Sequence, residues 1–280
     1  MTDFLPRDEF LEKEPDKRPG ECSPGSSLIV EHDGRIANLR LNRPHAGNVL
    51  DGDLLEELLS ALKQVRRTGQ TRVIVLSGAG ADFCTGADMG EFATAVVSDR
   101  TGNEVRHLLS LGRAVCQELA RSEAVTIGQL QGRVIGAGLA LAVHCDLRVS
   151  SDSATFRLPE LTLGFPPVWG GSSARLINEI GAARLRELLL IGDRVDATFA
   201  YTYGIAHRVC PESELGASVR KLGSRLSRRD EVATKTAKHL FAASEAVARL
   251  GDITTLEDDL FWNSLRERSK VISRKQPDSE

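Results

Sequence analysis

The chain lacks the features that direct proteins to membranes, to nucleic acids or to export. No apolar run approaches the ~20 residues of a membrane-spanning helix, and the acidic, proline-bearing start has neither the charged nor the apolar region of a signal peptide. The 36 basic and 39 acidic residues give a net charge of -3, so no basic field attracts nucleic acid or an anionic membrane surface. These absences predict a cytoplasmic protein that has neither nucleic acid nor a membrane among its partners.

Cysteine is scarce as well, and its spacing does not indicate a disulfide framework. The five cysteines are an odd number, and none forms a Cys-x-x-Cys pair or a Cys/His spacing typical of a metal site. The sequence therefore predicts reduced, mostly buried thiols and no metal site.

The segments that are present indicate an arm followed by a folded core. Residues 1–27 are rich in charge, proline, glycine and serine, which predicts a flexible N-terminal arm. From residue 28 apolar and polar residues alternate on both sides of Asp33-Gly34, which predicts an antiparallel hairpin. At 280 residues, the chain is long enough for one large domain, or for one domain with a helical appendage.

The middle of the chain alternates between strand and helix patterns. Asp51 is expected to cap a helix, because leucines recur at helical spacing from Leu54 to Leu62. Further strands and helices are expected at residues 73–76, 125–130, 139–143, 147–149 and 173–180. This alternation predicts an α/β fold with a parallel core, and the helical patterns at 217–226, 231–250 and 256–272 predict a helical C-terminal part.

Two glycine-punctuated stretches each run from an apolar strand through small residues toward a helix. They are Arg72-Val-Ile-Val-Leu-Ser-Gly-Ala-Gly-Ala-Asp-Phe-Cys-Thr-Gly-Ala-Asp88 and Gly132-Arg-Val-Ile-Gly-Ala-Gly-Leu-Ala-Leu-Ala-Val-His-Cys-Asp146. Small residues let backbone N–H groups approach a ligand carbonyl, and a helix N-terminus adds partial positive charge. Each stretch alone also fits a phosphate-binding or purely structural turn. The pair favours an oxyanion hole that holds an enolate.

Two later stretches extend the pattern, and together the four resemble a known family. Ala154-Thr-Phe-Arg-Leu-Pro-Glu-Leu-Thr-Leu-Gly164 and Gly192-Asp-Arg-Val-Asp-Ala197 follow in this order. Over residues 28–215 the sequence resembles the crotonase superfamily, also called the enoyl-CoA hydratase/isomerase family. The resemblance implies a spiral of ββα units stacked as two sheets, with residues 216–280 forming a helical part involved in oligomerisation. It also implies a homotrimer or a dimer of trimers.

The resemblance further implies an enzyme that acts on an acyl thioester, carried by coenzyme A or by an acyl carrier. No cofactor is expected to be bound permanently, because coenzyme A enters as part of the substrate. The oxyanion-hole donors would be the backbone N–H groups of Ala87 and Ala137. The other positions expected to contact the substrate near the two glycine turns are Asp82, Phe83, Cys84, Gly86, Gly136 and Gly138.

The acid-base groups depart from those of the family's hydratases, which use two glutamates. The later glutamate matches Glu160, whereas the earlier one falls on Ala140, which has no proton to give. Adding water to a double bond needs one group for the water and another for the α-proton, whereas moving a double bond needs a single base. We therefore expect an enoyl-CoA isomerase type of proton transfer, in which burial raises the pKa of Glu160.

Several alternatives stay open at this level. The enolate is also consistent with decarboxylation or carbon–carbon chemistry, and the loss at Ala140 is consistent with a non-catalytic acyl-thioester-binding subunit. A hydratase would need a second group, for which His144 is a candidate because it lies one helical turn after Ala140; otherwise His144 is a packed histidine bonded to backbone. Phe165 and Trp169 fit either an acyl pocket or the core.

Two charged residues near the first glycine turn also have alternative roles. Arg43 either meets the phosphates of coenzyme A or is an ordinary solvated cation. Asp88 is expected to cap a helix rather than to take part in catalysis.

Overall fold

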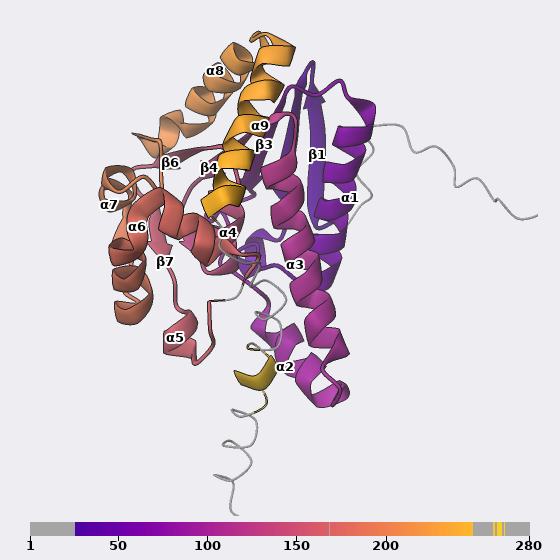
Figure 1. Ribbon diagram of the computed structural model, residues 1–280, viewed down its shortest axis with the longest axis vertical. Helices are drawn as coiled ribbons and strands as arrows, with labels where there is room; N and C mark the ends of the chain where they lie inside the picture. Colours follow the sequence, from indigo (N-terminus) through magenta and orange to yellow (C-terminus); the bar gives the residue numbers. More distant parts are fainter. Residues whose placement is uncertain (1–25, 168, 249–259, 261, 265, 267–280) are drawn as a thin grey trace, which may run out of the picture.

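A computed structural model describes residues 26–167, 169–248, 260, 262–264 and 266. Nearly all of the predicted arm, and most of the helix predicted over 256–272, lie outside these residues. The described part is a mixed α/β fold in which helices cover both faces of a sheet (Figure 1).

The larger sheet has six strands in the order β1-β2-β3-β4-β6-β9. These strands span Leu28–Asp33, Ile36–Leu41, Val73–Gly78, Val125–Leu130, Leu147–Ser151 and Arg208–Cys210. Strands β1 and β2 pair antiparallel and close at Asp33 and Ile36, whereas every later pair in this sheet is parallel. The predicted hairpin and the predicted parallel core are both confirmed.

The smaller sheet explains why the chain winds as a spiral. It contains β5 (Arg133–Ile135), β7 (Thr155–Arg157) and β8 (Val195–Asp196) in the order β5-β7-β8. The chain passes from β4 in the large sheet directly to β5 in the small one, and then from β6 to β7. Cys84 pairs with Val134 of β5 by a parallel bridge, so the segment after β3 repeats the same path. Successive turns of the chain therefore stack on one another, as a crotonase-like spiral requires.

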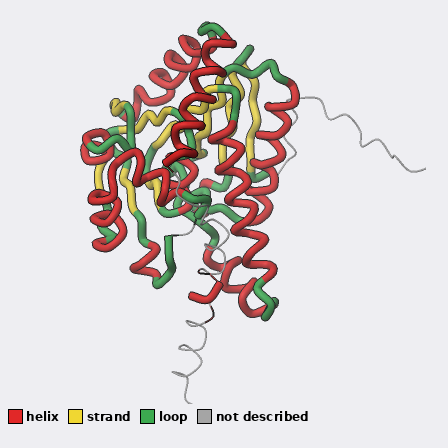
Figure 2. Tube along the Cα trace, viewed as in Figure 1, coloured by secondary structure: helices red, strands yellow, loops and turns green. Residues whose placement is uncertain are grey.

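Helices fill the connections between these strands (Figure 2). The α-helices are α1 (Gly52–Thr68), α2 (Met89–Ser98), α3 (Asn103–Arg121), α4 (Ala137–Val143), α5 (Glu160–Leu163), α6 (Ser172–Ile191), α7 (Ala197–Thr202), α8 (Leu215–Ser227) and α9 (Glu231–Ala248), and short 3-10 helices lie at Pro44–Ala46 and Glu212–Glu214. Asp51 caps α1 as predicted, because its Oδ1 accepts a hydrogen bond of 2.9 Å from Leu54 N.

The large sheet separates two apolar clusters. The larger cluster contains the buried leucines of α1, the apolar face of α3 and the alanine, leucine and valine residues of α4. The smaller one lies where α8 packs on β3, β4 and β6, with Leu215, Val219 and Leu222 against the strands.

Helices α8 and α9 confirm the expected helical pattern after residue 215, and their part in oligomerisation stays a prediction. No helix of the described residues has both the length and the apolar character needed to cross a membrane.

Candidate active site

The first glycine turn begins where β3 ends, and the buried side chain of Asn48 holds its shape. Asn48 has a left-handed backbone (φ 55°), which asparagine tolerates better than most residues. Its Nδ2 donates to Ala79 O at 2.9 Å and to Asp82 O at 2.8 Å, and its Oδ1 accepts from Arg43 N at 2.9 Å. A Cβ at Gly78 would collide with the carbonyl oxygens of Asp82 and Phe83, so the turn requires glycine there.

An ion pair between Asp82 and Arg133 joins this turn to the second glycine turn. Asp82 Oδ1 accepts from Arg133 N and Nε, both at 2.9 Å, and Oδ2 accepts from Arg133 Nη2 at 2.7 Å. The hydrogen bonds from Arg133 lower the pKa of Asp82, although burial of the carboxylate opposes them. The backbone adds Cys84 N to Arg133 O at 3.1 Å and Ile135 N to Cys84 O at 3.0 Å. The two turns are therefore one structural unit.

The side chains of Phe83 and Cys84 lie in the core, and the expected contact of these residues with the substrate stays a prediction. Both side chains are fully buried in the larger apolar cluster, and their backbone N–H groups already donate to Gln131 O and Arg133 O. Burial raises the pKa of the Cys84 thiol to about 12, so this cysteine is not a nucleophile at neutral pH. Phe83 and Cys84 therefore pack against the core and position the first turn. The carboxylate of Asp82 is bound by Arg133.

The structure brings together the two amides expected to form the oxyanion hole. Among the hydrogen bonds of the described residues, neither Ala87 N nor Ala137 N donates to a backbone acceptor. Ala137 is the first residue of α4, where the helix supplies no acceptor. A Cβ at Gly86 would lie 3.8 Å from Ala137 N, and one at Gly138 would collide with Cys84 O. The small residues at Gly86 and Gly138 thus allow the turns to approach closely.

Asp88 and Arg43 stabilise the first turn from outside. The Oδ1 of Asp88 caps α2 as predicted, accepting from Gly90 N at 3.0 Å and Glu91 N at 3.2 Å. Arg43 Nη1 lies 2.7 Å from Asp51 Oδ2 and 3.8 Å from Asp88 Oδ2, and it donates to Val49 O. Arg43 is therefore not an ordinary solvated cation, because it links the residues that cap α1 and α2.

Glu160 lies beside the second glycine turn with half of its carboxylate unpaired. A Cβ at Gly136 would lie 3.3 Å from Glu160 Oε1, which places the carboxylate next to the residue before Ala137. The Oε2 atom is buried and has no hydrogen-bond partner among the described residues. Burial raises the pKa of Glu160 from 4.5 to about 7. This carboxyl group is therefore suited to exchange a proton near neutral pH.

Helix α4 presents no second acid to this site from the position of Ala140. Ala140 is buried, and its carbonyl oxygen lies 2.7 Å from Nδ1 of His144, which follows the last residue of α4. Seven residues separate Ala137 from His144, a rise of roughly 10 Å along a helix. The imidazole is thus held at the end of α4 opposite Ala137, and its acid-base role stays a prediction.

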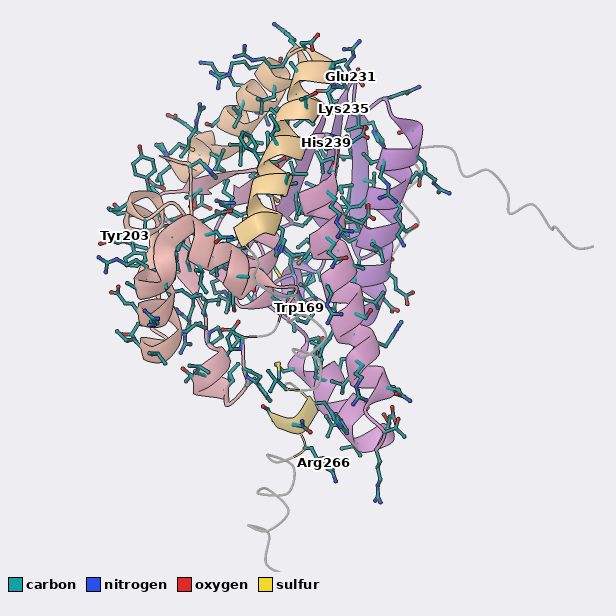
Figure 3. The ribbon with its side chains drawn as sticks, viewed as in Figure 1. Trp169, Tyr203, Glu231, Lys235, His239 and Arg266 are labelled. Carbon is teal, nitrogen blue, oxygen red and sulfur yellow. The ribbon has the colours of Figure 1, made fainter. Side chains whose placement is uncertain are left out.

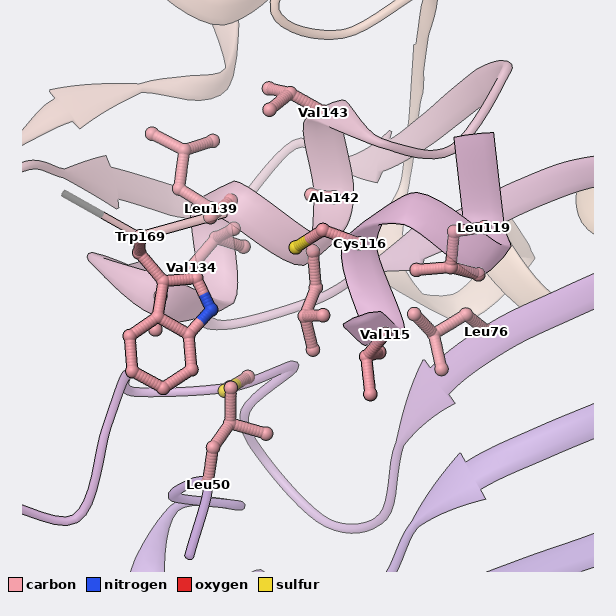
Figure 4. Packing of buried hydrophobic residues seen from close by; sticks show 14 of the residues in the cluster. Leu50, Leu76, Val115, Cys116, Leu119, Val134, Leu139, Ala142, Val143 and Trp169 are labelled. Atoms are coloured by element: carbon pink, nitrogen blue, oxygen red, sulfur yellow. The ribbon is translucent and has the colours of Figure 1, made fainter. Parts of the chain in front are cut away.

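Trp169 and Phe165 both belong to the larger apolar cluster. Figure 4 shows Trp169 among other members of this cluster. The indole of Trp169 lies against α3, because a Cβ at Gly112 would be 2.6 Å from its Cε2 atom. Phe92 meets it edge to face with ring centroids 6.3 Å apart. The Trp169 Nε1 atom is buried without a hydrogen-bond partner among the described residues. Both aromatic residues pack in the core, and a contact with substrate stays a prediction.

Comparison with known proteins identifies relatives over most of the chain. The family model described as enoyl-CoA hydratase/isomerase matches residues 31–274. A probable enoyl-CoA hydratase of Mycobacterium bovis is 32% identical over 239 residues, which cover 85% of this chain and 88% of the relative. The 2,3-dehydroadipyl-CoA hydratase of Escherichia coli is 33% identical over 226 residues, covering 80% of this chain and 84% of the relative. The crystal structure of an enoyl-CoA hydratase from Bacillus anthracis superposes with a TM-score of 0.73 at 27% identity, covering 89% of this chain and 97% of that one.

The ion pair between the turns predicts a measurable coupling. In a double-mutant cycle of Asp82→Asn and Arg133→Met, we expect a coupling free energy of about 1 to 3 kcal/mol in urea unfolding, because the carboxylate is buried. The matched control is the exposed pair Arg184 and Glu187, for which the same cycle is expected to give about 0.5 kcal/mol or less. Equal coupling in the two cycles would contradict a joining role for Asp82 and Arg133.

Glu160 predicts a pH-dependent loss of stability. Its pKa is about 7 in the folded chain and 4.5 as the ordinary value, so the unfolded chain ionises first as the pH rises. The wild-type protein is therefore expected to lose up to about 3 kcal/mol of unfolding free energy as the pH rises from 4.5 through 7. Denaturant unfolding at several pH values, compared with Glu160→Gln, isolates this contribution. Parallel pH profiles for the two proteins would show that the carboxyl is not shifted.

Proposed function

Because the chain belongs to the enoyl-CoA hydratase/isomerase family, we propose that it moves a double bond in an acyl-CoA thioester with Glu160 as the only base. The observation that carries the proposal is the buried, unpaired Oε2 of Glu160 beside the turn that presents the Ala137 amide. Helix α4 offers only the methyl group of Ala140 where the family's hydratases, by sequence resemblance, carry their other glutamate.

In the proposed reaction the thioester oxygen of a 3-enoyl substrate accepts hydrogen bonds from Ala87 N and Ala137 N. The carboxylate of Glu160 removes a proton from C2, and the electrons of that C–H bond move into a dienolate whose charge rests on the thioester oxygen. The protonated Glu160, whose proton exchanges with solvent, then delivers a proton to C4, so that the double bond lies between C2 and C3 and the carboxylate is restored. Each amide is expected to stabilise the dienolate by about 3 kcal/mol.

The raised pKa of Glu160 supports this cycle, because one group must both accept and return the proton. A carboxyl group with a pKa of about 7 is half ionised at neutral pH, whereas one at 4.5 would return the proton poorly. We also propose that no cofactor is bound permanently and that coenzyme A enters with the substrate. The isomerisation rate is expected to rise with pH and to level off above the pKa of Glu160.

Hydration is the second candidate, because the relatives described above are named as hydratases. Water addition needs a group that activates the water in addition to one that handles the α-proton. Glu160 can supply only one of these roles, and His144 is held at the far end of α4. Decarboxylation of a malonyl-type thioester remains a third candidate, since the amide pair would stabilise the resulting enolate without any base.

Replacing the base tests these candidates directly. In Glu160→Gln we expect isomerisation of 3-enoyl-CoA, and deuterium exchange at C2, to fall by about 10²- to 10⁴-fold, because the amide cannot accept the proton. Mass spectrometry of products formed in D₂O from 3-enoyl, 2-enoyl and malonyl-type thioesters gives the measurement. Glu187→Gln is the control, because Glu187 lies on the exposed side of α6 in an ion pair with Arg184.

Each other result identifies a different reaction. Net hydration of a 2-enoyl thioester by the wild-type protein, with no movement of the 3-enoyl double bond, would show that the reaction is hydration and not isomerisation. Release of carbon dioxide from the malonyl-type thioester, if it persists in Glu160→Gln, would show that the reaction is decarboxylation. Binding of all three thioesters without turnover or exchange would show that the protein is a non-catalytic, thioester-binding subunit.

The tryptophan beside α3 predicts a limit on the acyl chain. Trp169 occupies the space above Gly112, so we expect Trp169→Ala to raise kcat/KM for eight-carbon relative to four-carbon thioesters by about tenfold or more. Trp262→Ala is the matched control: Trp262 is the only other tryptophan, it is also buried, and it packs on Gly102. The same change in chain-length preference in both variants would indicate general loosening of the core.

A further inference from the structure

A second candidate site lies on α8, away from the glycine turns. It is a cavity of about 800 Å³ lined by Arg208, Ser218, Lys221, Leu222, Ser224, Arg225, Arg228 and Arg229. Its volume falls within the range of about 300 to 1,000 Å³ that small-molecule pockets occupy. The side chains come from successive turns of α8, from the residues just after it, and from the first residue of β9.

All charged side chains that line this cavity are positive. Five of its lining residues are Arg or Lys and none is Asp or Glu, although the whole chain has a net charge of -3. None of the five cations forms an ion pair with a carboxylate of the described residues. The acids that follow in sequence are used elsewhere: Asp230 Oδ1 accepts from Ala233 N, and Glu231 pairs with Arg72 and Lys235.

The cavity lies at the opposite end of the large sheet from Glu160. Arg229 O accepts a hydrogen bond from Nη2 of Arg72, the residue that immediately precedes β3, whereas the first glycine turn follows β3. Figure 3 likewise shows Glu231, which follows α8, at the upper end of the molecule and Trp169 well below it. A ligand in this cavity would not contact the proposed catalytic groups.

We propose that this cavity binds a small anion carrying two or more phosphate groups. Guanidinium groups match phosphate oxygens with paired hydrogen bonds, and the hydroxyls of Ser218 and Ser224 offer further donors. Like charges held together repel one another, so an anion that neutralises them gains affinity. A single phosphate would leave most of the five cations unpaired, whereas a diphosphate carries enough charge and oxygen atoms to meet several.

The lining residues distinguish this ligand from nucleic acid. Single-stranded nucleic acid is held by aromatic side chains on which bases stack, and none of the described residues that line the cavity is aromatic. The absence of an aromatic surface also means that a nucleoside attached to the diphosphate gains little. Inorganic pyrophosphate is therefore expected to bind about as tightly as ADP.

Isothermal titration of the full-length protein with pyrophosphate, in 150 mM NaCl, tests the proposal. We expect saturable binding to one site per chain, at least about tenfold weaker in Arg225→Ala and in Lys221→Ala because each loses a charge-assisted hydrogen bond. Arg220→Ala is the matched control: Arg220 is an exposed cation on the same helix that does not line the cavity, and its removal is expected to leave the affinity unchanged.

The same titrations contain the results that would overturn the proposal. Absence of saturable binding to the wild-type protein would show that the cavity is not a phosphate site. If Arg220→Ala lost as much affinity as Arg225→Ala and Lys221→Ala, the cations would attract the anion only through their summed charge and not through a defined site. Tighter binding of a single-stranded oligonucleotide than of pyrophosphate would make the surface a nucleic-acid site instead. Binding needs no turnover, so these outcomes are independent of the role of Glu160.

Discussion

The active site depends on how closely two backbone turns approach each other. Adding a single carbon at Gly132 or Gly138 would bring it into collision with the carbonyl oxygens of Ala81 or Cys84, so the second turn can reach the first only with glycine at those positions. Once the turns are in contact, the ion pair of Asp82 with Arg133 fixes their relative position. The two amides and Glu160 owe their mutual placement to this contact, because Gly136 lies between them.

The same packing explains why Glu160, the proposed base, has a raised pKa and destabilises the fold when it is ionised. A carboxyl group surrounded by protein loses hydration, and nothing in the described residues replaces it at Oε2. The fold therefore keeps the group partly protonated at neutral pH, which a purely structural glutamate would not need. The unpaired Oε2 among the described residues supports the proposal that its partner arrives with the substrate.

Local patterns in the sequence were sufficient for the features that depend on neighbouring residues. The hairpin at Asp33-Gly34, the helix caps at Asp51 and Asp88, and the strand-turn-helix form of both glycine stretches were predicted correctly. Glu160 was singled out as the candidate base because its proline and its flanking leucines match a family pattern, and this role stays a prediction. These features need no knowledge of which distant segments meet.

Features that depend on distant contacts were not predictable. Asn48 supports a turn that lies about thirty residues later in the sequence. The only local signal is that an asparagine follows a glycine, which indicates a turn at Asn48 itself but not its distant contact. In the sequence Arg133 looks like a surface arginine, because its partner Asp82 lies far away along the chain. The role of Arg43 was left between solvent and phosphate because the sequence does not show its ion pair with Asp51. Phe83 and Cys84 were expected to contact the substrate because they lie in the first glycine stretch. The complete burial of their side chains depends on tertiary contacts that the motif alone does not show.

The bridge between Cys84 and Val134 also sets the spacing of the two donors. Ala87 follows Cys84 by three residues, and Ala137 follows Val134 by three, so the amides occupy equivalent positions in consecutive turns of the spiral. Their separation therefore derives from the distance between neighbouring strands, about 4.8 Å. Two N–H groups about 2.9 Å from a shared oxygen are themselves separated by about 4 to 5 Å. The spacing between successive turns of the spiral thus sets the separation of the two proposed oxyanion-hole donors. The length of either loop can change without altering this separation, provided the three residues after each bridge are kept.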